Sequence, residues 1–167
     1  MLKKFYPGEY LDSAYEIDFE GLYQEGYRGI IFDIDNTLVP HGAPADRRAK
    51  RLFAHLKEQG YRCCLLSNNK EARVKMFRDG VTGSVQYIYK AGKPGRAGYE
   101  RAMEMMGTSR ENTIFVGDQI FTDVYGANRV GIRTFLTKPI HPKEEIQIVL
   151  KRYLEKIVLF FYKKSRK

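Results

Sequence analysis

Short apolar runs, each bounded by polar residues, recur along most of the chain. Each run is only a few residues long and is rich in β-branched, aromatic and leucine residues, which is typical of strands buried in a sheet. The sequence therefore predicts a series of short strands. They cover residues 29–32, 61–66, 85–89, 112–116 and 131–136.

Segments with helical spacing alternate with these strands. Residues 46–60 carry apolar residues at intervals of three and four, with Asp46 placed as an N-cap and Gly60 as a stop. Residues 96–107 predict a second helix and residues 70–78 a shorter one. Because strands and helices alternate, we expect an α/β fold, a Rossmann-like parallel sheet with helices on both faces.

The length and composition of the chain predict one domain. Its 167 residues and 43% hydrophobic content suit a single compact domain with a sizeable core. We expect this domain to span residues 1–167, with a lead-in over 1–27 and a basic amphipathic helix over about 143–167. The adjacent Cys63 and Cys64 lie on a predicted buried strand and are interpreted as core residues. The sequence has no secretory signal, so the expected location is the cytoplasm.

Polar side chains follow the predicted strands directly. Asp33 and Asp35 come after the first strand, and where that strand ends the second side chain can swing over the first. Two close carboxylates repel each other as bare anions, so the pair favours a hard cation such as Mg²⁺. Ser67 and Asn68 end the second strand and offer a hydroxyl and an amide to phosphate oxygens.

Three charged residues complete this set. Lys93 lies in a Gly-Lys-Pro turn after the third strand, and Asp118 and Asp123 follow the fourth. Singly, each residue also fits a structural role; Asp123, for example, could cap the helix that follows. Together they favour phosphoryl chemistry, because each lies just beyond a predicted strand, where open α/β sheets bind their ligands.

These residues resemble the four motifs of the haloacid dehalogenase (HAD) superfamily of phosphatases. The motifs are Asp33-Ile34-Asp35-Asn36-Thr37, Ser67, Lys93, and Gly117-Asp118 with Asp123. The resemblance implies that Asp33 attacks phosphorus and forms an aspartyl-phosphate. It also implies that Asp35 protonates the leaving oxygen and then activates water for the second step.

The resemblance assigns roles to the remaining site residues as well. Ser67 and Lys93 would hold the transferring phosphoryl oxygens. Asp123 would orient the metal shell. The Mg²⁺ ligands would be Asp118, the carboxylate of Asp33 and the main-chain carbonyl of Asp35.

The gaps between the motifs are too short to hold a cap domain, so the chain resembles the capless subfamily III. An open site favours a large substrate, or a partner subunit that closes the cleft. His41 follows the first motif and is interpreted as a surface-loop residue rather than a substrate contact. Three basic residues near the cleft are interpreted as solvated. These are Lys70, Arg73 and Lys90.

Within the capless group the chain resembles the YqeG-type subfamily. The likeness rests on the Asp-Ile-Asp-Asn-Thr-Leu motif at residues 33–38, the Ser-Asn-Asn motif at 67–69 and the short gaps. That subfamily is related to the mitochondrial phosphatidylglycerophosphate phosphatases, which implies a lipid phosphomonoester at the membrane. A soluble sugar or nucleotide phosphate stays an alternative, because the four motifs do not distinguish among these esters.

The last segment of the chain carries much of its net charge of +9. Residues 138–167 hold nine Lys or Arg against three Glu, a surplus of six. The continuous apolar run in the predicted helix is too short to span a bilayer, which needs about 20 apolar residues. Its apolar stripe either anchors the protein on an anionic leaflet or packs on the domain's own sheet or a dimer partner. The stripe contains Ile146, Val149, Leu150, Tyr153, Ile157, Phe160 and Phe161, and is widened by Leu154, Val158, Leu159 and Tyr162.

A basic balance is also common in RNA- or ribosome-associated proteins. Charge is the only feature of the sequence that supports this class, and no nucleic-acid-binding motif accompanies it. We therefore expect an enzyme acting on a phosphomonoester, and do not expect nucleic acid as a partner.

Overall fold

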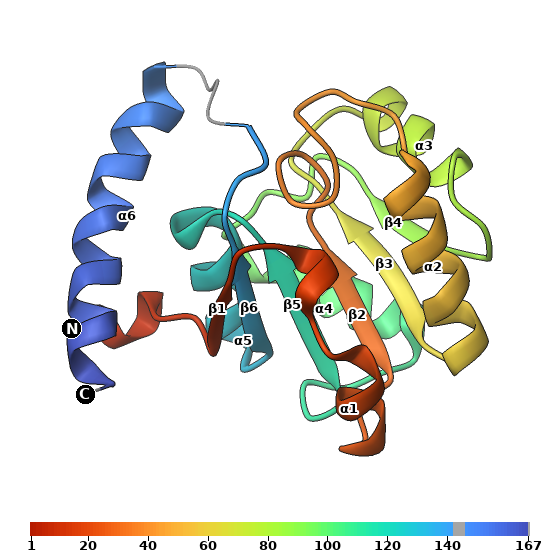
Figure 1. Ribbon diagram of the computed structural model, residues 1–167, viewed down its shortest axis with the longest axis horizontal. Helices are drawn as coiled ribbons and strands as arrows, with labels where there is room; N and C mark the ends of the chain where they lie inside the picture. The colour runs from red at the N-terminus through yellow and green to blue at the C-terminus, as the bar shows by residue number, and fades with distance from the viewer. Residues whose placement is uncertain (142–145, 167) are drawn as a thin grey trace.

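The computed structural model of the chain describes residues 1–141 and 146–166. Six parallel strands form one sheet in the order β1-β6-β5-β2-β3-β4 (Figure 1). The predicted Rossmann-like α/β architecture is therefore confirmed. The strands are β1 (Glu9–Leu11), β2 (Gly29–Phe32), β3 (Arg62–Leu66), β4 (Gln86–Ile88), β5 (Thr113–Gly117) and β6 (Arg133–Thr137).

Helices connect these strands throughout the described residues. The α-helices are α1 (Phe19–Gln24), α2 (Arg47–Gln59), α3 (Glu71–Asp79), α4 (Arg96–Met106), α5 (Tyr125–Val130) and α6 (Ile146–Ser165). Three shorter helical turns are Leu2–Phe5, Ala14–Glu16 and Ile120–Val124.

The helices cover both faces of the sheet, as predicted (Figure 1). On one face, α2 and α3 bury Phe53 and Phe77 in the same apolar cluster as Phe32 of β2. On the other face, α4 buries Tyr99 in a second cluster with Ile31 of β2. Neighbouring residues of β2 point to opposite faces because a strand has a side-chain period of two. Burial on both faces explains why its sequence is continuously apolar.

The ends of α2 follow the predicted capping. The side chain of Asp46 accepts a hydrogen bond from the main-chain N–H of Ala49 at 2.9 Å. Gly60 ends the helix with a φ of +97°, in the left-handed region that favours glycine. The helix predicted at residues 96–107 ends in the same way at Gly107.

The sequence did not predict β1. This short edge strand lies in the lead-in and pairs with β6, with Glu9 opposite Phe135 and Leu11 opposite Thr137. It is partly exposed and begins with a glutamate, so it has no continuous apolar run to mark it. The lead-in is thus part of the sheet.

The connections around the sheet are short. Residues 33–46 join β2 to α2, and α3 is the single helix between β3 and β4. No cap domain is evident in the part of the chain that the structure describes, in agreement with the prediction. Cys63 and Cys64 are both buried as free thiols in the core, as predicted.

Helix α6 lies beyond the β1 edge of the sheet (Figure 1). The predicted helix over about 143–167 includes residues 143–145 and 167, which lie outside the described residues. Val158 and Tyr162 are buried against the body of the protein. Most of the other apolar residues of the predicted stripe are exposed, so the two alternatives for this stripe, a lipid surface or a protein contact, both stay open for them. The exposed residues are Val149, Leu150, Tyr153, Leu154, Ile157, Phe160 and Phe161.

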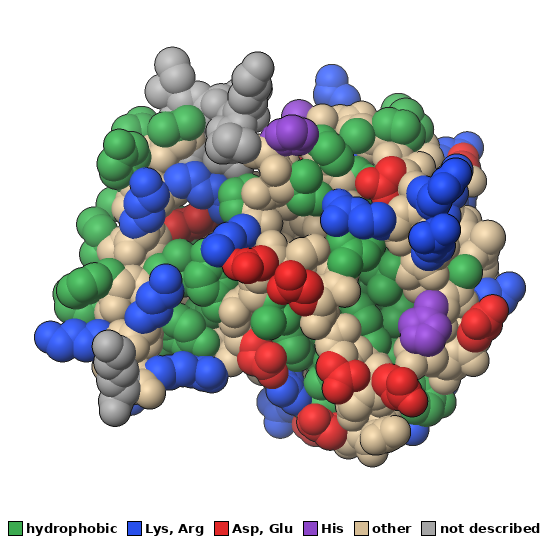
Figure 2. Space-filling model, in the orientation of Figure 1, with side chains coloured by type: hydrophobic (Ala, Val, Ile, Leu, Met, Phe, Trp, Pro, Cys, Tyr) green, Lys and Arg blue, Asp and Glu red, His purple; other side chains and the backbone are tan. Residues whose placement is uncertain are grey.

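Apolar and basic side chains lie together on the surface of α6 (Figure 2). Among the described helices, including α6, none has the length and apolar character needed to cross a membrane.

Candidate active site

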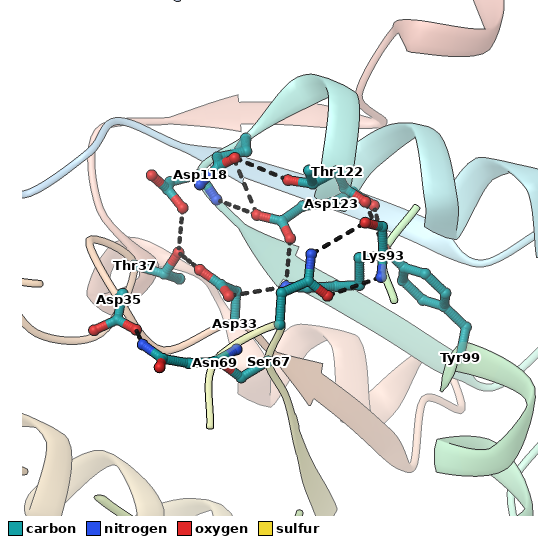
Figure 3. A network of polar contacts seen from close by, with 12 residues as sticks. Asp33, Asp35, Thr37, Ser67, Asn69, Lys93, Tyr99, Asp118, Thr122 and Asp123 are labelled. Carbon is teal, nitrogen blue, oxygen red and sulfur yellow. Dashed lines mark hydrogen bonds and ion pairs between the residues drawn. The ribbon is translucent and has the colours of Figure 1, made fainter. Parts of the chain in front are cut away.

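The polar residues predicted from the sequence meet at the carboxyl ends of neighbouring strands. Asp33 follows β2, Ser67 follows β3 and Asp118 follows β5, and these three strands are adjacent in the sheet. Lys93 and Asp123 reach the same place from the loops after β4 and β5 (Figure 3). The topology therefore brings residues far apart in the sequence to one site.

Asp33 is held on both carboxylate oxygens. Its Oδ1 accepts a hydrogen bond from Nζ of Lys93 at 2.9 Å. Its Oδ2 lies 3.2 Å from the hydroxyl of Thr37, which is also 3.1 Å from Oδ1 of Asp118. All of these side chains are buried. Asp33 is thus fixed in position at the end of a rigid strand.

Asp123 organises the loop that carries Asp118. Its Oδ2 accepts the main-chain N–H groups of Asp118 and Gln119, at 3.2 and 3.1 Å. Its Oδ1 accepts Nζ of Lys93 at 2.7 Å. A Cβ on Gly117 would lie 2.6 Å from that carboxylate, which explains the glycine before Asp118. The contacts of Asp123 are therefore not those of a cap on the next helix, which was its alternative role.

Burial and charge shift the pKa values at this site. Burial raises the pKa of Asp33 to about 6, against the lowering effect of Lys93. Burial, then the charges of Asp33 and Asp123, raise the pKa of Asp118 well above its ordinary value. Burial acts to lower the pKa of Lys93, but Asp123 and Asp33 outweigh it and raise that pKa. Lys93 is therefore a permanent buried cation.

The carboxylates fit a divalent cation. Asp33, Asp118 and Asp123 each offer an oxygen, and these oxygens lie within 4.8 Å of one another. Within the described residues, two cations contact them, Lys93 and Arg152. Three buried carboxylates outnumber these two cations, and carboxylate oxygens are the ligands that hard divalent ions prefer. The donor set suits a hard divalent cation.

Ser67 and Asn68 hold the turn that faces this site. The hydroxyl of Ser67 is buried and accepts the main-chain N–H of Asn69 at 3.0 Å. The side-chain amide of Asn68 donates to the main-chain carbonyl of Lys93 at 3.0 Å, and its oxygen accepts the Lys93 N–H at 2.8 Å. Asn68 thereby fixes the Lys93 loop, while its contact with phosphate stays a prediction.

Asp35 lies at the edge of the site and has its own set of partners. Its Oδ1 accepts hydrogen bonds from the N–H of Gly42 at 2.8 Å and from Nη2 of Arg73 at 2.9 Å. Its Oδ2 accepts the Asn69 amide at 3.3 Å. Burial acts to raise the pKa of Asp35, but Gly42 and Arg73 outweigh it and lower that pKa. The exposed His41 has Nδ1 3.9 Å from Oδ1 of the same carboxylate.

The comparisons with known proteins agree with this geometry. A family model described as HAD-hydrolase-like matches residues 90–143. Over 167 residues the chain is 37% identical to Probable phosphatase YqeG of Bacillus subtilis, covering 99% of this chain and 96% of that relative. The chain belongs to the YqeG type of HAD-like phosphatases. It is therefore a phosphoric monoester hydrolase.

This YqeG-type phosphatase also matches part of a longer protein. It is 30% identical over 160 residues to phosphatidylglycerophosphate phosphatase 1 of Arabidopsis thaliana. The match covers 84% of this chain and 45% of the relative, so the chain spans about half the length of that protein.

A solved structure shares the fold. The core domain of a candidate phosphoglycolate phosphatase from Streptococcus pneumoniae TIGR4 superposes with a TM-score of 0.50. The superposition covers 77% of this chain and 96% of that chain, at 18% sequence identity. This likeness concerns the fold of the YqeG-type phosphatase alone.

Three residues of this phosphatase were missed or misread from the sequence. Arg73 was interpreted as solvated, but its side chain is only 9% exposed and is bound to Asp35, so that interpretation is wrong. Arg152 and Glu155 of α6 also reach the site, where Arg152 contacts Asp118. Their positions in a basic, amphipathic stretch gave no local signal of this role.

Proposed function

We propose that this phosphatase transfers the phosphoryl group of a monoester first to Asp33 and then to water, with Mg²⁺ as cofactor. The observation that carries the proposal is the buried Asp33 carboxylate at the end of β2, between Lys93 and Thr37 and beside Asp118. A carboxylate nucleophile with a fixed cation and a cation site around it is sufficient for this chemistry.

The proposed reaction has two chemical steps. In the first, an oxygen of Asp33 forms a bond to phosphorus as the bond to the leaving oxygen breaks, and Asp35, which enters this step in its protonated form once substrate displaces its cationic partner, gives that oxygen a proton. In the second, Asp35 takes a proton from water as the water oxygen attacks phosphorus, which releases inorganic phosphate and the Asp33 carboxylate. Ser67 and Lys93 hold the phosphoryl oxygens in both steps.

The contacts of the acidic residues support an assignment of the metal ligands. The carboxylates of Asp33 and Asp118 and the main-chain carbonyl of Asp35 would bind Mg²⁺. Asp123 keeps its place as the partner of Lys93 and of two main-chain N–H groups. Bound there, Mg²⁺ would neutralise phosphoryl charge and align the group with Asp33.

A lipid phosphomonoester of the phosphatidylglycerophosphate kind is the proposed substrate. Similarity to the Arabidopsis thaliana phosphatase supports this class of substrate. The exposed apolar residues of α6 lie beside exposed lysines such as Lys163 and Lys164, a combination that suits an anionic membrane surface. We place the protein at the cytoplasmic face of the membrane, bound peripherally.

Phosphate release with Mg²⁺ tests this function. The substrates are phosphatidylglycerophosphate in mixed micelles and a panel of soluble sugar and nucleotide phosphates. Asp33→Asn should reduce turnover of every substrate to background, while the exposed Asp79→Asn should act as wild type. Preference for the lipid is the expected result. Preference for a soluble ester would overturn the lipid assignment, and turnover by Asp33→Asn would overturn the mechanism.

A further inference from the structure

Helix α6 contributes two side chains to the loop that carries Asp118. Arg152 donates from Nη2 to the carboxylate of Asp118 and from Nη1 to the main-chain carbonyl of the same residue. Nη1 also lies 3.0 Å from Oε2 of Glu155. The other oxygen of Glu155, Oε1, accepts the main-chain N–H of Ile120 at 2.8 Å. The helix is therefore joined to this loop at two residues.

These contacts are buried. The side chain of Asp118 is fully enclosed, and those of Arg152 and Glu155 are 17% and 8% exposed. Charge-assisted hydrogen bonds are stronger and shorter than neutral ones, and burial limits their screening by salt. A basic residue in an exposed amphipathic helix needs no such partner, so the arrangement differs from ordinary surface ion pairs.

The contacts fix the orientation of Asp118 on both of its oxygens. Thr37 lies 3.1 Å from Oδ1, and Arg152 binds Oδ2. Glu155 holds Ile120 at the start of the turn that leads to Asp123. Two of the three carboxylates at the candidate metal site thus belong to a loop that α6 contacts through Arg152 and Glu155.

We propose that Arg152 and Glu155 are positioning residues of the divalent-cation site, so that the C-terminal helix is part of the active site. The proposal rests on the function proposed above, because it assumes that Asp118 is a ligand of Mg²⁺. Residues that orient metal ligands typically change metal affinity by about 10- to 100-fold when they are removed.

Arg152 could instead oppose cation binding, since it is a positive charge on a ligand. The two roles predict opposite results. A positioning residue holds the loop in the binding conformation, so its loss weakens Mg²⁺ binding. A competing cation blocks the ligand, so its loss tightens binding.

The test is the affinity for Mg²⁺ of the full-length chain, measured by titration calorimetry and by the Mg²⁺ concentration at half-maximal hydrolysis of p-nitrophenyl phosphate. The variants are Arg152→Ala, Arg152→Lys and Glu155→Gln. Lys151→Ala is the matched control, because it removes the same charge from the neighbouring exposed position of α6.

We expect Arg152→Ala to weaken Mg²⁺ binding by about 10- to 100-fold, with the substrate KM at saturating Mg²⁺ changed far less. Arg152→Lys keeps the charge but loses the two-pronged contact, so it should bind Mg²⁺ with an intermediate affinity. Glu155→Gln should weaken binding and leave the fold intact, and it serves if Arg152→Ala does not fold. Lys151→Ala should match wild type.

Unchanged or tighter Mg²⁺ binding in folded Arg152→Ala or Arg152→Lys would overturn the inference while leaving the proposed function standing. If wild type itself neither binds Mg²⁺ nor needs it for turnover, the metal part of the proposed function fails, and the inference fails with it.

Discussion

At the scale of single residues, the site depends on Lys93, whose ammonium group is shared by two carboxylates. Its ammonium group contacts Asp33 at 2.9 Å and Asp123 at 2.7 Å, and its main chain is fixed by Asn68. One cation therefore orients both the proposed nucleophile and the residue that organises the Asp118 loop. Buried charges of this kind are stable only when paired, so each member of the group requires the others.

The raised pKa of Asp33, about 6, leads to a pH-dependent effect of Mg²⁺. Because the ordinary value is 3.8, the folded protein holds this proton more tightly than the unfolded chain does. Without a cation, stability should therefore fall as the pH rises through this interval. Mg²⁺ binds the deprotonated carboxylates and should reverse the loss.

We therefore expect saturating Mg²⁺ to raise the Tm by several degrees near pH 7.5 and by little near pH 5. Thermal unfolding with and without Mg²⁺ at the two pH values measures this, and Ca²⁺ gives a comparison ion. An equal Tm shift at both pH values would contradict the assignment of the Asp33 and Asp118 carboxylates as metal ligands.

Arg73 allows a prediction about the acid step. Nε and Nη2 of Arg73 both hold Oδ1 of Asp35, at 3.1 and 2.9 Å. If Asp35 protonates the leaving oxygen, a substrate with a good leaving group should depend less on its position. Arg73→Ala removes a charge that lowers the pKa of Asp35, but it also frees that carboxyl to turn away from the leaving oxygen. We expect the lost orientation to dominate, so kcat should fall by on the order of 100-fold for an alkyl phosphate but by much less for p-nitrophenyl phosphate.

The control is Arg78→Ala, which removes an arginine of the same helix whose ion-pair partner is Asp79. Equal losses of kcat on the two substrates in Arg73→Ala would show that Arg73 has a general structural or phosphate-binding role instead.

At the scale of elements, the sequence predicted those with a strong periodic signal. Strands β2 and β5 are apolar because both faces are covered, and α2 has clear start and stop residues, so each was recognised. The short β1 lacks such a pattern, and the Ile120–Val124 turn depends on tertiary contacts of Asp123. For α6, periodicity indicated a helix but not which side faces the protein.

The direction of α6 is set by contacts that a local pattern does not reveal. Arg152 and Glu155 are polar, yet they face the body of the protein, whereas Leu154 and Phe160 are 57% and 63% exposed. The apolar face of an amphipathic helix usually packs on the protein. On this part of α6, the polar residues that contact the active-site loop face the protein instead, and several apolar residues face solvent.

The outward face of α6 should bind an anionic bilayer. Leu154→Asp combined with Phe160→Asp should weaken binding to phosphatidylglycerol vesicles by about 100-fold. Each of the two apolar side chains, once buried in the bilayer, contributes roughly 1.5 kcal/mol to binding. Turnover of p-nitrophenyl phosphate should be unchanged, since both side chains point to solvent. Vesicle co-sedimentation measures the binding.

Met76→Asp is the control for a general surface effect, because Met76 is an exposed apolar residue of α3. Vesicles of neutral lipid should bind poorly in every case. Unchanged binding of the α6 double variant to anionic vesicles would contradict a membrane role for this face. So would a stable wild-type dimer that dissociates in the double variant.

At the scale of the whole molecule, the parallel sheet explains why the site could be predicted. Asp33, Ser67 and Asp118 each follow a strand, and parallel strands end at a common edge, so their proximity follows from topology. Arg73 and Arg152 come from helices, where facing directions depend on packing. Sequence patterns therefore gave the motif residues but not the arginines that hold them.

The central claim is that Asp33 carries the phosphoryl group during turnover. The most direct measurement is acid quench of a single turnover with labelled phosphomonoester and Mg²⁺, followed by mapping of the labelled peptide. The account predicts a hydroxylamine-sensitive phosphoryl group on Asp33 in wild type and none in folded Asp33→Asn. Label on another residue, or turnover by Asp33→Asn, would contradict it.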